Sequence, residues 1–164
     1  MTTYGSDTTM VNRPKQIGTA GETAVTRAAR TRGFPNADRL TLTGNKDRGD
    51  IGLCPGVIVE VKAGEAARRA TDQQVAKWLL ETETERRNAN ADVGLLVTAR
   101  TGIGAPNAHR WACHMWTSTF LTILGAPHLL ELVPDPYAPI RMTFESALAL
   151  LRSAGYGDPE GNTP

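Results

Sequence analysis

Cysteine is scarce in this sequence, and long apolar runs are missing. The 164 residues include two cysteines, Cys54 and Cys113, which are too few for a disulfide-stapled fold or a four-cysteine zinc site. No run of 18 or more apolar residues is present, so the sequence predicts no membrane-spanning helix. The polar N-terminus lacks the apolar segment of a secretory signal. We therefore expect a protein of the reducing cytoplasm.

Several familiar catalytic signatures are also missing. The sequence contains no Walker phosphate-binding loop, no Gly-x-Gly-x-x-Gly fingerprint and no Ser-His-Asp order. It therefore gives no reason to expect a nucleotide or another small-molecule cofactor.

The length fits one folded domain, at about 150 residues per domain. We expect a flexible N-terminal arm over residues 1–14, a single domain over 15–156 and a disordered tail over 157–164. Residues 1–70 hold 11 lysines and arginines against 7 acidic residues, a net charge of +4, whereas residues 71–164 carry a net charge of −3. A basic first half favours a polyanionic partner, although such charge is more often solvated surface.

Hydrophobic periodicity predicts a mixed α/β order. Apolar spacing predicts a helix from Ile17 that stops at Gly33. Thr71 opens a second long helix with a capping box, and Thr143 is expected to cap a last helix. Strands are expected over 39–43, 50–54, 57–62, 93–98 and 111–116, with a short helix over 117–124. The core order is helix, three strands, helix, strand, followed by C-terminal additions around a mixed central sheet.

The strand Val57–Lys62 combines apolar and charged positions. Because side chains alternate along a strand, Val57, Val59 and Val61 are expected to face the core, and Glu60 and Lys62 the other side. Buried charge is costly unless it is paired or binds a metal. This pattern therefore marks Glu60 and Lys62 as candidate functional residues.

Strand register decides whether Asp50 joins them. With a two-residue turn at Pro55-Gly56, Asp50 would oppose Val61 and diverge from Glu60. With a three-residue loop or an equivalent bulge, Asp50 would face Glu60, and Gly56 would occupy the left-handed position that such a loop favours. We predict the second register.

Two converging carboxylates can hold Mg²⁺ or Mn²⁺, since hard cations prefer oxygen ligands. A lysine beside the metal can orient a water nucleophile or stabilise charge in the transition state. Glu22 lies at the margin of the apolar stripe of the first helix, where it could reach the metal, directly or through water, or remain an exposed helix residue.

This set of residues resembles the PD-(D/E)XK nuclease superfamily. Gly49-Asp50 matches its Pro-Asp element, with glycine in place of proline, and Glu60-Val61-Lys62 matches its (D/E)XK element. The residues that resemble archaeal-type and actinobacteriophage Holliday junction resolvases are Gly18-Thr-Ala-Gly-Glu22, Gly33-Phe34 and Gln74-Val75. The resemblance covers roughly residues 15–98. Thr43-Gly44-Asn45-Lys46 stands where the family has a serine or threonine loop, without the serine itself.

The resemblance implies a restriction-endonuclease-like core and cleavage of branched double-stranded DNA, leaving 5′-phosphate and 3′-hydroxyl ends. Asp50, Glu60 and the Val61 carbonyl would bind the metal with help from Glu22, and Lys62 would activate water. Gln74 would position the lysine or the water, although a glutamine at this place in a capping box needs no other role. The resemblance also implies a homodimer that acts in phage recombination, repair or packaging in the host cytoplasm.

Two other functions stay open. The chain could be a restriction-like or repair nuclease that cuts linear or flapped DNA, because this fold supports several nuclease functions. It could also be a catalytically silent DNA-binding module. Candidate phosphate contacts are Lys15, Arg27, Arg30, Arg32, Lys46, Arg48, Arg68 and Arg69.

A second cluster in the C-terminal half is more ambiguous. His109, Cys113 and His114 lack a fourth zinc ligand, so we favour a structural role. Trp111 and Trp116 could stack on bases, but a place in the core or in a dimer interface is the commoner role of such residues.

Overall fold

Six strands form one mixed sheet in the computed structural model, which describes residues 12–42 and 44–158. The strands are β1 (Asp38–Arg39), β2 (Ile51–Cys54), β3 (Val57–Lys62), β4 (Val93–Thr98), β5 (Ala112–Trp116) and β6 (Pro139–Thr143). Their order in the sheet follows the chain, and only β3 and β4 pair in parallel. The α-helices are α1 (Arg13–Arg30), α2 (Glu65–Arg68), α3 (Asp72–Asn88), α4 (Thr117–Ile123) and α5 (Phe144–Ser153). Two 3₁₀ segments, η1 (Ala105–Arg110) and η2 (Pro127–Leu132), complete the fold.

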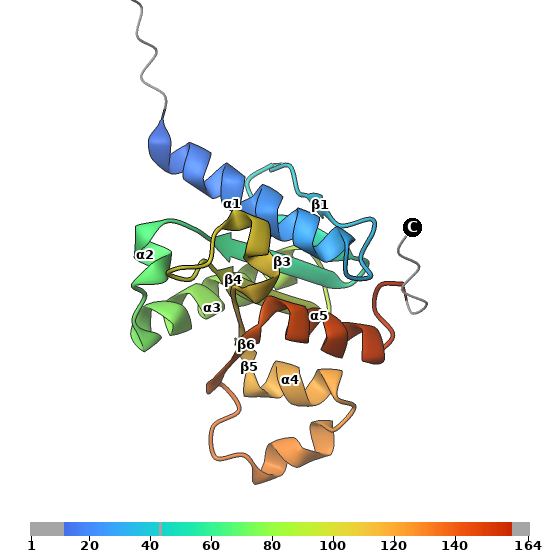
Figure 1. The fold of residues 1–164 in the computed structure, drawn as a ribbon. Coiled ribbons are helices and arrows are strands. Elements are labelled where there is room, and N and C mark those ends of the chain that lie inside the picture. The colour runs from blue at the N-terminus through green and yellow to red at the C-terminus, as the bar shows by residue number, and fades with distance from the viewer. Residues whose placement is uncertain (1–11, 43, 159–164) are drawn as a thin grey trace, which may run out of the picture.

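Helices cover both faces of the sheet (Figure 1). One face buries Val59, Leu95 and Cys113 in the larger core, together with apolar residues of α1, α5 and η1. The opposite face packs on α3, where Leu79 meets Leu96 in a smaller core. This architecture confirms the expected mixed α/β sheet with flanking helices. Within the described ranges, no helix has both the length and the apolar character needed to cross a membrane.

The first helix begins earlier than expected. Arg13 and Pro14 belong to α1, so the predicted loose arm is wrong for these two residues; residues 1–11 lie outside the described part. Proline suits the first turn of a helix because its missing N–H would have no partner there. The predicted stop holds, since α1 ends at Arg30 and Gly33 follows with φ of +91°.

The strand expected over residues 39–43 is shorter in the structure. Only Arg39 of that range lies in β1, and Thr43 lies outside the described residues. Its partner strand β2 begins at Ile51, because Gly49 turns the chain with φ of +88°. The Leu40 N–H still donates to the Asp50 carbonyl. Among the described residues after Leu40, none continues the pairing with β2.

The β2–β3 hairpin has the register predicted from its turn. Ile51 pairs with Val59 and Gly52 with Ile58, whereas Cys54 pairs with Val57 beside the turn. The shift between Gly52 and Cys54 is a bulge that adds one residue to β2. Continued past Ile51, this register sets Asp50 opposite Glu60, as predicted.

The C-terminal additions were expected only in part. The predicted β5, α4 and Thr143 cap are confirmed; the Ser146 N–H donates to Thr143 Oγ1 at 3.3 Å. Strand β6 and segment η2 were not expected, because β6 begins with proline, which strands disfavour, and none of its residues is fully buried. The prediction of a disordered tail is wrong for Gly157 and Asp158, since the Asp158 N–H donates to the Gly33 carbonyl at 2.8 Å.

Candidate active site

Asp50 lies where β2 is about to begin, against the backbone of β3. Its Oδ2 accepts a hydrogen bond from the Val61 N–H at 2.8 Å, and its own N–H donates to the Val59 carbonyl at 3.1 Å. The N–H and C=O of a strand residue point to the same side. The Val61 carbonyl therefore faces the same edge of β3 as the Asp50 carboxylate.

Glu60 and Lys62 share the face of β3 that is turned toward α3. Lys62 Nζ donates to Glu60 Oε1 at 2.7 Å. The Glu60 side chain is only 8% exposed, and the Lys62 side chain 27%. Lys62 Nζ also lies 5.9 Å from the centre of the Trp78 ring and 4.0 Å from Glu81 Oε2. The predicted alternation along β3 is therefore confirmed.

Burial perturbs both carboxylates. Burial, and after it the charge of Glu60, raises the pKa of Asp50 from 3.8 to about 7, against the hydrogen bond from Val61. Burial also raises the pKa of Glu60 from 4.5 to about 7, although Lys62 opposes the shift. For Lys62, burial works to lower the pKa, but the surrounding carboxylates outweigh it and raise the pKa. Both carboxyl groups therefore hold their protons more tightly than they would in water, because burial disfavours the ionised form.

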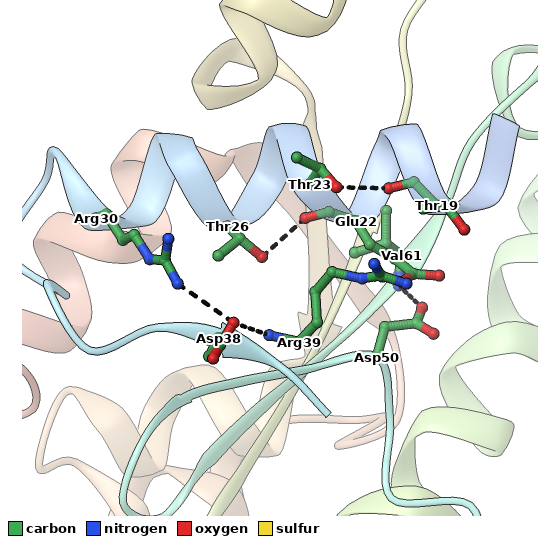
Figure 2. A network of polar contacts seen from close by, with 9 residues as sticks. All are labelled: Thr19, Glu22, Thr23, Thr26, Arg30, Asp38, Arg39, Asp50 and Val61. Carbon is green, nitrogen blue, oxygen red and sulfur yellow. Dashed lines mark hydrogen bonds and ion pairs between the residues drawn. The ribbon is translucent and has the colours of Figure 1, made fainter. Parts of the chain in front are cut away.

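Glu22 belongs to α1, which covers the face of the sheet opposite α3, and its side chain lies near Asp50 (Figure 2). A close contact fixes the helix there: a Cβ on Gly21 would lie 2.6 Å from Ala63 Cβ, directly after β3. Glu22 Oε2 accepts a hydrogen bond from Arg39 Nε at 2.7 Å. The structure thus brings Glu22 to the predicted site, where Arg39 already pairs with it.

Arg39 and Glu85 are site residues that the sequence analysis missed. Figure 2 shows the Arg39 guanidinium directed to the space between Glu22 and Asp50. Glu85 is 7% exposed on α3, its carboxyl group interacts with that of Glu60, and its Oε2 has no hydrogen-bond partner among the described residues. Burial raises its pKa. Trp78, Glu81 and Glu85 are spaced three and four residues apart, so they share one face of the helix, and this spacing could have identified Glu85 as a site residue.

Gln74 lies on the same face of α3, one turn before Trp78. Its backbone N–H donates to Thr71 Oγ1 at 3.2 Å, so the predicted cap is confirmed. No hydrogen bond of its side chain is present among the described residues. The Thr71 half of the predicted capping box is thus present, whereas the reciprocal bond from the Gln74 side chain is not found among the described residues. The catalytic role of Gln74 stays a prediction.

The candidate phosphate contacts are spread over several surfaces. Lys46 and Arg48 line a hollow of about 140 Å³ together with Asp50. On α1, Lys15 lies on the face of Glu22, whereas Arg27 lies about 140° around the helix from it.

The other basic candidates already have partners in the chain. Arg30 is paired with Asp38, Arg32 donates to the Ala28 carbonyl, and Arg68 and Arg69 both approach Glu65. Of the basic set, Lys46 and Arg48 are thus the residues that share a hollow with Asp50.

The donor set fits a hard divalent cation in part. Asp50, Glu60 and the Val61 carbonyl offer oxygen ligands at one strand edge, which is the chemistry Mg²⁺ prefers. Over residues 12–42 and 44–158, no group of three His, Cys, Asp or Glu side chains is arranged to hold a metal. Glu22 forms an ion pair with Arg39, and Glu60 forms one with Lys62. These ion pairs must break before either carboxylate can become an additional metal ligand.

Two members of the second cluster have contacts within the fold. His114 Nε2 lies 3.0 Å from Thr98 Oγ1, and Cys113 is buried on the opposite face of β5. Trp111 donates its indole N–H to the Ile103 carbonyl and is 3% exposed, and Trp116 is 7% exposed. These tryptophans belong to the core and are not stacking platforms for bases.

Comparisons with protein-family models, curated proteins and solved structures found no match to this chain. The geometry of the candidate site and the sequence motif are therefore the evidence for its function.

Proposed function

We propose that this chain is a metal-dependent DNA endonuclease with a restriction-endonuclease-like core. The observation that carries the proposal is the convergence of Asp50, Glu60 and the Val61 carbonyl at one edge of β3, with Lys62 bonded to Glu60. The Glu22, Gly49-Asp50 and Glu60-Val61-Lys62 pattern of the PD-(D/E)XK superfamily falls on these same residues. Two independent properties, motif and geometry, thus support one site.

The residues have distinct roles in this proposal. Asp50, Glu60 and the Val61 carbonyl would hold Mg²⁺ or Mn²⁺, and Glu22 would assist after release from Arg39. The bound cation supplies Lewis-acid stabilisation of charge on the phosphate. Lys62 orients the attacking water by hydrogen bonding, and its positive charge favours the anionic transition state. The water oxygen bonds to phosphorus as the bond to the 3′-oxygen breaks, which leaves 5′-phosphate and 3′-hydroxyl ends.

The substrate we propose is branched double-stranded DNA, with the four-way junction first. Support comes from the resolvase-like segments around Glu22, Gly33 and Gln74 and from the basic loop beside Asp50. Cutting two symmetric strands needs two sites, so a homodimer is part of the proposal. A cytoplasmic location, in the host if the chain is phage-encoded, also belongs to it.

A cleavage experiment tests this function. The full chain is incubated with an end-labelled synthetic four-way junction, or with a linear duplex of the same sequence, in Mg²⁺, Mn²⁺ or EDTA. We expect paired symmetric nicks in the junction, only with metal. Cleavage of both substrates would indicate a general or restriction-like nuclease. Junction binding without cleavage would indicate a silent binding module.

Two variants tie the activity to the site. Asp50→Asn should abolish cleavage and leave junction binding in EDTA intact. Glu131→Gln, at an exposed residue of η2, is the matched control and should cut like the parent. Full activity of Asp50→Asn would show that the site is assigned to the wrong residues.

A further inference from the structure

A second concave site lies on the same face of the sheet, across α3 from the carboxylates. Its cavity has a volume of about 540 Å³ and lies between α2, the start of α3 and strands β4 to β6. A row of paired residues crosses the sheet from Glu60 through Leu96 and His114 to Arg141. Because α3 packs on Leu96 through Leu79, it separates the carboxylates from this cavity.

Arginines from three separate elements line the cavity. Arg68 comes from α2, Arg100 from the segment after β4 and Arg141 from β6, while Asp72 is the single acidic residue in the lining. Arg100 and Arg141 form no ion pair with any of the described residues, and Arg68 lies 3.8 Å from Glu65. The cavity therefore has two more positive than negative side chains. The nuclease mechanism uses neither Arg100 nor Arg141.

The neutral lining fits an organic phosphate. Four alanines give the cavity an apolar surface, and Thr98 and Thr101 add hydroxyl groups to its lining. Burial, and after it the charge of Arg141, lowers the pKa of His114 to about 4, so the ring is neutral at pH 7. The volume lies in the range of small-molecule sites, roughly 300–1,000 Å³. Guanidinium groups bind phosphate oxygens in bidentate fashion.

We propose that this cavity binds the phosphate of a nucleotide through Arg68, Arg100 and Arg141. The nucleotide is either a free mononucleotide or the 5′-phosphorylated end of a DNA strand; both offer the same phosphate chemistry. The site needs no divalent cation, because its charge comes from arginines. It therefore stands whether or not Asp50 and Glu60 form a nuclease site.

Calorimetric titration in EDTA tests the cavity alone. The full-length Asp50→Asn protein is titrated with inorganic phosphate, with thymidine monophosphate, and with a single-stranded octanucleotide that carries either a 5′-phosphate or a 5′-hydroxyl. We expect thymidine monophosphate to bind. A 5′-phosphate that strengthens octanucleotide binding about tenfold would identify a DNA end as the ligand, and equal binding of both octanucleotides would identify the free nucleotide.

Matched arginine substitutions locate the binding. Arg100→Gln and Arg141→Gln should each weaken thymidine monophosphate binding about tenfold or more, since each removes charge-assisted hydrogen bonds. Arg87→Gln removes the same charge from an exposed residue of α3, 72% exposed, and should change nothing. Circular dichroism confirms that each variant is folded. Absence of thymidine monophosphate binding together with equal binding of the two octanucleotides, or equal binding of thymidine monophosphate by all three variants, would overturn the proposal.

Discussion

Replacing Asp50 by asparagine should stabilise the metal-free protein. The substitution removes a buried negative charge that lies beside Glu60 and Glu22. The asparagine Oδ1 can still accept the hydrogen bond from the Val61 N–H, so the local geometry is retained. A residue kept for metal binding is thus expected to cost stability when no metal is present.

The magnitude follows from the pKa of Asp50, which rises from 3.8 to about 7 on folding. The folded carboxyl binds its proton more tightly than the unfolded one, so its contribution to stability is greatest below pH 4. That contribution falls as the pH rises and is lost above about 7. Each pKa unit corresponds to about 1.4 kcal/mol. We expect Asp50→Asn to gain about 2–4 kcal/mol at pH 8, and almost nothing at pH 4. For a chain of this length that is a Tm increase of about 5–15 °C at pH 8.

Thermal unfolding followed by circular dichroism checks this at pH 4 and pH 8 in EDTA, with Glu131→Gln as the control. Adding Mg²⁺ at pH 8 should then raise the Tm of the parent more than that of Asp50→Asn, because bound metal stabilises the folded state. A lower Tm for Asp50→Asn at pH 8 would refute the electrostatic reasoning, since the carboxylate would then be stabilising in its ionised form.

Three further predictions concern activity and packing. Lys62→Ala should abolish cleavage and retain junction binding in a gel-shift assay with EDTA; cleavage at the parent rate would remove Lys62 from the mechanism. At fixed Mg²⁺, initial cleavage rates should rise with pH through about 7 and then level off, because Asp50 and Glu60 must lose their protons to bind metal; a rate that falls over this range would contradict that requirement. Gly21→Ala should lower the free energy of unfolding by about 1–3 kcal/mol, because the new methyl group would overpack against Ala63. Gly18 has open space around it, so Gly18→Ala should raise the free energy of unfolding by up to about 1 kcal/mol by stabilising α1. Urea unfolding measures both values, and equal effects of the two substitutions would contradict the close contact at Gly21.

The centre of the candidate site could be predicted because it depends on local rules. Alternation along β3 assigns Glu60 and Lys62 to one face, and the turn at Pro55-Gly56 restricts Asp50 to two registers. The helix caps at Thr71 and Thr143 depend on neighbours three residues away. Each of these features arises within about a dozen residues of chain.

The parts that were missed depend on contacts between distant segments. Arg39 enters the site because α1 brings Glu22 beside β1, and Glu85 enters it because α3 crosses β4 toward Glu60. Strand β6 gives little signal of its own, since Pro139 and Arg141 are exposed and its pairing with β5 defines it. Sequence periodicity reports burial along one element and does not report which element lies across from it.

The bulge between Gly52 and Cys54 has a consequence for which changes the hairpin tolerates. Adding or deleting one residue between Asp50 and Glu60 would turn every side chain of one strand to the opposite face. Substitutions at the exposed Pro55 leave that count unchanged, whereas an insertion or deletion in the hairpin does not. Among homologous chains, this hairpin should therefore vary in composition while its length stays constant.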